Sequence, residues 1–173
     1  MNKFDAKRRA FLRGAYLTRE GRNEEAQRQN PLGPPPPWHQ DLPLESHCID
    51  CARPCVTACE PGIIHIHPHG HRQAGIPYLN FEASGCTFCR ACVEACPLDI
   101  ETQHKPAPRI GTLTLNRGSC IAWDDIICMS CSNRCDYKAI TTSHQRRAQV
   151  DADICTGCGM CVAACPVNAL SVV

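Results

Sequence analysis

Sixteen cysteines fall into four groups of four, and their spacing is that of metal ligands. The groups that begin at Cys86 and Cys155 both read C-x2-C-x2-C-x3-C-P. Three thiolates two residues apart let a tight loop wrap three iron atoms of a cube, and the fourth lies one helical turn further on. This pattern is typical of bacterial ferredoxins and predicts [4Fe–4S] clusters. The candidate ligands are Cys48, Cys51, Cys55, Cys59, Cys86, Cys89, Cys92, Cys96, Cys120, Cys128, Cys131, Cys135, Cys155, Cys158, Cys161 and Cys165.

The first and third groups depart from this spacing. The first has one extra residue before Cys55, and the third has seven residues between Cys120 and Cys128 and no proline after Cys135. Each group still ends in C-x3-C, and an insertion lengthens a loop without moving the last two thiols. We therefore expect four clusters, or three if the third group serves another purpose. Zinc bound by the same thiolates is the remaining alternative.

The fourth cysteine of each group is expected to serve a neighbouring cluster, because two-cluster ferredoxins exchange this ligand. Sequential ligation within each group stays open. The crossed arrangement would join Cys48, Cys51 and Cys55 with Cys96; Cys86, Cys89 and Cys92 with Cys59; Cys120, Cys128 and Cys131 with Cys165; and Cys155, Cys158 and Cys161 with Cys135.

A disulfide scaffold is the other class of protein with this cysteine content. No apolar run follows Met1, and the first thirty residues hold eight lysines or arginines, so no secretory signal is predicted. The uncharged stretch 154–173 contains four cysteines and a proline, so we expect no membrane span there. A soluble cytoplasmic protein with reduced, metal-ligating cysteines is the prediction.

Two hairpins are expected between the cysteine groups, from residues 63–66 with 76–81 and from residues 139–142 with 148–151. The groups begin 34 to 38 residues apart, which indicates a duplicated unit. We expect an α+β fold of two tandem bacterial-ferredoxin-like halves, each with two clusters, behind an extended N-terminal arm. The expected boundaries are 1–45 for the basic arm and its Pro-rich linker, 46–105 for the first half and 106–173 for the second half.

Other residues are expected to be structural. The histidines at 65, 67, 69 and 71 are predicted to form a solvent-facing turn, and Trp38 and Trp123 are predicted to pack. No nucleophile–base pair, phosphate-binding glycine loop or basic aromatic stripe is present, so neither an enzyme nor a nucleic-acid-binding protein is expected.

The whole pattern resembles the NapF family of ferredoxin-type proteins of the periplasmic nitrate reductase system. The resemblance rests on the four cysteine groups, a Pro-Pro-Trp ahead of the first group, and the opening FDAKRRAFLRG from Phe4 to Gly14. It implies a cytoplasmic [4Fe–4S] protein that acts in maturation of, or electron supply to, the catalytic subunit NapA before export. NapA or its chaperone is the implied partner. A polyferredoxin electron-transfer subunit of another redox complex is the alternative.

The N-terminal arm contains Arg8 and Arg9 in a box that resembles a twin-arginine export signal. Residues 1–30 carry a net charge of +4, and the polar sequence after the box cannot act as an apolar export segment. We therefore expect Arg8 and Arg9 to bind a partner and not to direct export. A solvated charged tail is the alternative.

Overall fold

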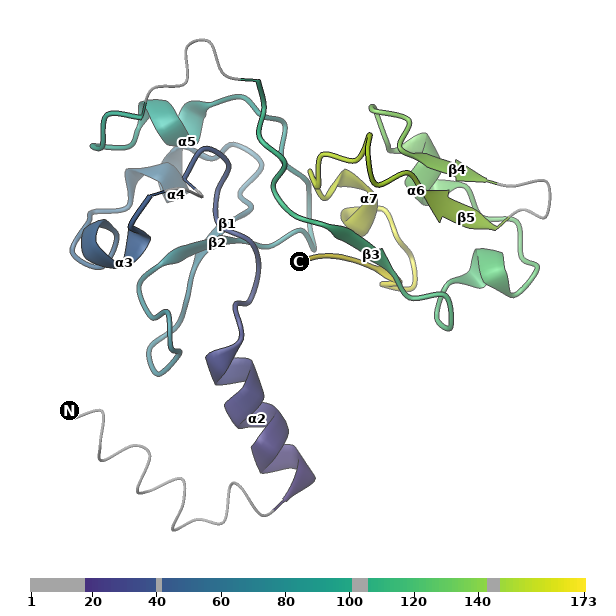
Figure 1. Ribbon diagram of the computed structural model, residues 1–173, viewed down its shortest axis with the longest axis horizontal. Coiled ribbons are helices and arrows are strands. Elements are labelled where there is room, and N and C mark those ends of the chain that lie inside the picture. Colours follow the sequence, from purple (N-terminus) through teal and green to yellow (C-terminus); the bar gives the residue numbers. More distant parts are fainter. Residues whose placement is uncertain (1–17, 40–41, 101–105, 143–146) are drawn as a thin grey trace.

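The computed structural model describes residues 18–39, 42–100, 106–142 and 147–173. Two lobes lie side by side, residues 42–100 forming the first lobe and residues 106–142 with 147–173 the second (Figure 1). The helices are α2 (Arg19–Gln29), α3 (Leu44–His47), α4 (Pro54–Ala58), α5 (Ala91–Glu94), η1 (Ile121–Trp123), α6 (Ser130–Asn133) and α7 (Met160–Ala163). The strands are β1 (Ile64–Ile66), β2 (Pro77–Leu79), β3 (Leu113–Leu115), β4 (Ile140–Thr142), β5 (Ala148–Val150) and β6 (Leu170–Val172). Within the described ranges, no helix combines the length and apolarity needed to cross a bilayer.

Both predicted hairpins are confirmed. Strand β1 pairs antiparallel with β2, with Ile64 opposite Leu79, and β4 pairs antiparallel with β5, with Ile140 opposite Val150. Alternation along each strand buries Ile64, Leu79 and Ile140 toward the cysteine-bearing loops. The short helices α4 and α5 pack together in the first lobe, as α6 and α7 do in the second.

A third sheet, β3 with β6, was not predicted from the sequence. It pairs Leu113 with Val172 and Leu115 with Leu170, so it joins residues nearly sixty positions apart. The side chain of Thr114 bonds to Ser171 across this pair. The second lobe therefore has two hydrogen-bonded sheets, whereas the first lobe has one.

The two lobes share a hydrophobic core. Ile110 and Val172 of the second lobe belong to the same buried cluster as Ile63, Leu79 and other residues of the first. The ring of Phe81 in the first lobe also lies directly against the backbone of Gly159 in the second, because a Cβ atom on Gly159 would overlap that ring. Each lobe thus contributes apolar surface that the other lobe buries.

The predicted solvent-facing histidine turn is wrong for two of its four residues. His65 and His69 are exposed, but His67 and His71 are 3% and 6% exposed and stack at 4.4 Å between ring centroids. His67 Nδ1 donates to the carbonyl of Ile76, and its Nε2 accepts from the N–H of Leu32. The rings are buried because backbone groups satisfy their nitrogens.

The polar helix α2 is joined to the first lobe through this histidine pair. Thr18 caps its start, with the side-chain oxygen accepting from the N–H of Gly21. After its end, His71 Nε2 donates to the carbonyl of Asn30. The helix extends away from the lobes (Figure 1). Arg8 and Arg9 lie outside the described residues.

Candidate iron–sulfur sites

The thiols gather into four quartets, three of which line cavities that are partly open to solvent, with about 330 to 350 Å³ of space between atoms when the open side is included. In the remaining quartet, burial and then the thiols of Cys48, Cys96 and Cys51 raise the pKa of Cys55. The quartets are quartet 1 (Cys48, Cys51, Cys55, Cys96), quartet 2 (Cys59, Cys86, Cys89, Cys92), quartet 3 (Cys120, Cys128, Cys131, Cys165) and quartet 4 (Cys135, Cys155, Cys158, Cys161).

This grouping is the crossed arrangement. Three cysteines of each quartet come from one group, and the fourth comes from the end of another group in the same lobe. The exchanged cysteines follow the ends of the short helices, and these helices pack in pairs, α4 with α5 in the first lobe and α6 with α7 in the second. The structure therefore does not bring the four cysteines of any one group around a common cavity.

Left-handed backbone shapes the loops of the second and fourth groups. Positions two and four residues after the first cysteine have positive φ angles, at Phe88 (55°) and Arg90 (68°) in one loop and Gly157 (70°) and Gly159 (77°) in the other. Glycine adopts this region without steric cost, whereas other residues do so only where their surroundings hold them. Each loop is followed by a short helix that contains the third cysteine of its group. This helix is α5 in the second group and α7 in the fourth.

A shared turn follows the last cysteine in three groups. Gly62, Lys138 and Asn168 all have positive φ and donate their N–H to the carbonyl of the cysteine three positions earlier. These carbonyls belong to Cys59, Cys135 and Cys165, at 2.9, 3.1 and 3.4 Å. The third group makes this turn without the trailing proline. The chain therefore turns after its last cysteine as it does in the first and fourth groups.

The seven-residue segment between Cys120 and Cys128 of the third group folds back on itself. It forms η1, and the indole Nε1 of Trp123 donates to the carbonyl of Ala148 at 3.2 Å. The guanidinium groups of Arg117 and Arg147 lie 4.5 and 5.1 Å from the same ring. These contacts hold the segment folded, so that Cys120 at its start lines the same cavity as the other three thiols of quartet 3.

The sulfur environment suits a cationic iron core. Burial, the largest cause, raises the pKa of Cys86 to about 11 and the pKa of Cys92 and Cys161 to about 12, and neighbouring thiols add to it. Buried thiolates packed this closely are stable only when positive charge neutralises them. Backbone N–H groups of Arg53, Phe88 and Ala169 also donate to cysteine sulfurs. Four thiols per cavity are the donor set that a [4Fe–4S] cluster requires.

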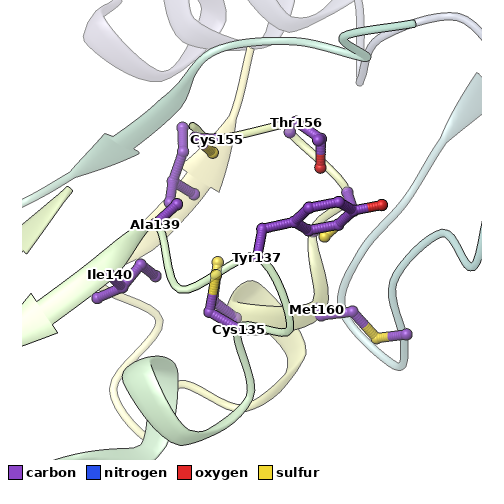
Figure 2. A pocket seen from close by; sticks show the side chains of 12 residues that line it. Cys135, Tyr137, Ala139, Ile140, Cys155, Thr156 and Met160 are labelled. Atoms are coloured by element: carbon purple, nitrogen blue, oxygen red, sulfur yellow. The ribbon is translucent and has the colours of Figure 1, made fainter. Parts of the chain in front are cut away.

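Quartets 2 and 4 meet where the lobes join. The N–H of Cys86 donates to the carbonyl of Cys158 at 2.7 Å. Tyr137 lines the cavity of quartet 4 beside Cys135 and Cys155 (Figure 2). Its ring meets that of Phe88 edge-on, with 6.4 Å between the ring centroids. Sequence reasoning missed Tyr137, although it stands directly after the Cys-Asp that replaces the expected Cys-Pro.

Comparison with known proteins agrees with this chemistry. A family model described as a 4Fe-4S dicluster domain matches residues 47–100, and one described as a 4Fe-4S binding domain matches residues 148–171. The third cysteine group lies outside both matches.

Three curated relatives are similar to the chain. Ferredoxin-type protein NapF of Escherichia coli is 34% identical over 98% of this chain and 95% of its own length. NapF of Haemophilus influenzae is 34% identical over 95% and 92%. Ferredoxin-type protein NapG of Haemophilus influenzae is 30% identical over 91% and 67%. The likeness extends over the cysteine groups and the sequence around them, and the chain belongs to the NapF family of ferredoxin-type proteins.

Proposed function

We propose that the chain binds four [4Fe–4S] clusters, one in each thiol quartet, with the fourth ligand exchanged between the two groups of a lobe. The observation that carries the proposal is the convergence of quartets 2, 3 and 4 on cavities of similar size. Quartet 3 rests on this geometry alone, because no family model matches its first three cysteines. Each cluster with four thiolates contributes a charge of about −2, so the loaded lobes are strongly acidic.

The proposed fold class is α+β, with two tandem two-cluster ferredoxin-like halves at residues 46–105 and 106–173 behind the arm and linker of 1–45. Two hairpins of the same kind, each beside two short helices, support the duplication. Binding clusters would stabilise the fold directly, because the ligands assemble only in the folded chain.

The proposed role is that of a cytoplasmic accessory protein of the periplasmic nitrate reductase system. In this role the chain matures the catalytic subunit NapA, or supplies it with electrons, before export. Membership of the NapF family supports this role. No disulfide joins any pair of the sixteen cysteines, which suits a reducing compartment. The chain would act as a carrier and not as an enzyme.

Electron transfer within another redox complex is the second candidate. The observation in its favour is that quartets adjoin in a row. At each boundary between quartets, a thiol of one quartet raises the pKa of a thiol in the next. Cys55 of quartet 1 does so for Cys92 of quartet 2. Cys158 of quartet 4 does so for Cys86 of quartet 2, and Cys131 of quartet 3 does so for Cys161 of quartet 4. Such a row suits electron passage between the two ends of the molecule.

Anaerobic purification of the full chain with an affinity tag tests both proposals. Iron and acid-labile sulfide should each approach sixteen atoms per chain, since four quartets are present. Saturation at twelve would remove quartet 3, and zinc without visible absorption would refute the clusters. Copurification of the NapA precursor or its chaperone supports the accessory role. Recovery with a different redox complex, and never with NapA, would favour the second candidate.

A further inference from the structure

The Pro-rich linker does not merely connect the arm to the body. The N–H of Leu79 in β2 donates to the carbonyl of Pro34 at 2.8 Å, and the side chains of Pro36 and Pro37 are fully buried. The contact with β2 is so close that a Cβ atom on Gly33 would overlap the carbonyl of Leu79. The linker is therefore packed on the first lobe immediately before Trp38.

Trp38 is held in an uncommon conformation against one thiol quartet. Its φ angle is +63°. The next residue, His39, stabilises the turn, because its N–H donates to the carbonyl of Pro36 and its Nδ1 donates to the carbonyl of Pro37. A tryptophan in the left-handed region persists only where the surrounding structure fixes it. The turn places Trp38 and Pro37 on the wall of the cavity of quartet 2.

Aromatic and cationic contacts orient the indole there. Its ring meets that of Phe88 edge-on, with 6.1 Å between centroids, and the Arg90 guanidinium lies 5.7 Å from it. Phe88 and Arg90 flank Cys89 and have positive φ angles. The indole thus packs on the loop that presents the thiols of quartet 2.

The indole Nε1–H of Trp38 is shielded from solvent and has no hydrogen-bond acceptor among the described residues. A buried donor without an acceptor is destabilising by about 1–3 kcal/mol. The cavity wall is otherwise built mostly from apolar side chains and the four thiols. Trp123 differs, because its Nε1–H is satisfied by the carbonyl of Ala148.

We propose that Trp38 tunes the iron–sulfur group of quartet 2, closing that cavity with its ring and donating its indole N–H to an inorganic sulfide of the cluster, because none of the four thiols accepts it. The inference rests on the proposal that quartet 2 holds a [4Fe–4S] cluster. Hydrogen bonds to sulfur stabilise the more negative, reduced state, and exclusion of water protects the cluster. Trp123 packs beside the cysteines of quartet 3, but its Nε1–H is already bonded to the carbonyl of Ala148, and the described residues that line the cavity of quartet 4 include no tryptophan.

The test compares Trp38→Phe, Trp38→Ala and the matched control Trp123→Phe in the full chain, purified anaerobically. Redox titration followed by EPR gives the potential of each cluster, and a Cys89→Ser variant identifies the signal of quartet 2. Trp38→Phe keeps the ring and removes the N–H, so it should shift that one potential to more negative values with unchanged iron content. Trp38→Ala should also lose that cluster several-fold faster in air. Trp123→Phe should leave the signal of quartet 2 unchanged.

The outcomes separate the two proposals. Wild-type protein with no cluster signal that depends on Cys89 would refute cluster binding at quartet 2 itself. A cluster that is present, with the same potential in Trp38→Phe as in wild type, would overturn the assignment of the indole N–H. A shift of equal size in all clusters, or in Trp123→Phe as well, would also overturn it. Because the Phe variant preserves the packing, these results do not depend on Trp38→Ala folding.

Discussion

The N–H of Cys86 donates a 2.7 Å hydrogen bond to the carbonyl of Cys158, so a cysteine of quartet 2 is tied to a cysteine of quartet 4 in the other lobe. The ligand sets proposed for the two lobes are separate, but their backbones are not. Phe88 and Tyr137 meet edge-on beside this bond. A substitution in the loop of Cys86 or in the loop of Cys158 should therefore alter the surroundings of the cluster in the other lobe, although each cluster keeps its own four thiols.

Crossed ligation predicts which cluster each terminal cysteine serves. Cys165→Ala should disturb the EPR signal that also depends on Cys120, because both thiols line one cavity. The matched variant Cys135→Ala should instead disturb the signal that depends on Cys158. EPR of the reduced proteins, with iron counted for each, makes the comparison. If Cys165→Ala removed only the signal shared with Cys158, ligation would be sequential.

The junction predicts an asymmetric effect of two glycine substitutions. Gly159 and Gly70 both have positive φ, at 77° and 90°, but only at Gly159 would a methyl group overlap Phe81. Gly70→Ala should lower the free energy of unfolding by about 1 kcal/mol from backbone strain. Gly159→Ala should lower it by about 3 kcal/mol, since overpacking adds to that strain. Denaturant titration followed by cluster absorbance measures both, and equal losses would mean that the lobes do not meet at Phe81.

Acid should loosen the attachment of α2 to the first lobe. Burial lowers the pKa of His67 below its usual value of 6.5. The neutral ring, which accepts from the N–H of Leu32, is therefore favoured in the folded protein. The stabilisation is present above pH 6.5 and is lost as the pH falls from 6.5 through the lowered pKa, because the unfolded chain binds the proton more readily.

Hydrogen–deuterium exchange of residues 30–34, corrected for intrinsic rates, tests this pH dependence. Protection should fall on acidification below pH 6.5 in wild type and should be low at all pH values in His67→Gln. The control His65→Gln alters an exposed ring in β1, two residues before His67, and should behave like wild type. Protection in wild type that does not change with pH would contradict the role of His67.

Arg8 and Arg9 are predicted to bind the partner. The Arg8→Ala, Arg9→Ala double variant should keep its full iron content, remain cytoplasmic and lose copurification with NapA or its chaperone. Guanidinium groups make paired contacts with carboxylates that alanine cannot replace. The matched control is Arg19→Ala with Arg22→Ala, which removes the same charge from exposed positions of α2. Equal loss in both variants would indicate general charge attraction, and unchanged binding would make the arm a solvated tail.

Local sequence was sufficient to predict both hairpins and to select the sixteen cysteines that the structure brings together in quartets. Cysteine spacing limits which thiols one loop can present, and alternating apolar residues such as Ile64 and Leu79 determine which face of a hairpin is buried. The left-handed loop positions are visible as Gly157 and Gly159 in the fourth group. They are hidden in the second group, where Phe88 and Arg90 adopt the same conformation.

Only the tertiary structure decided the contacts between distant residues. Three contacts join segments that are far apart in the sequence. They are the pairing of β3 with β6, the hydrogen bond between Cys86 and Cys158, and the packing of Trp38 against the cavity of quartet 2. The burial of His67 and His71 was not predicted, because the alternating histidines do not reveal that the carbonyls of Ile76 and Asn30 accept hydrogen bonds from these two rings. Periodicity reports the geometry of one element, whereas burial of a polar ring depends on which backbone groups other elements bring to it.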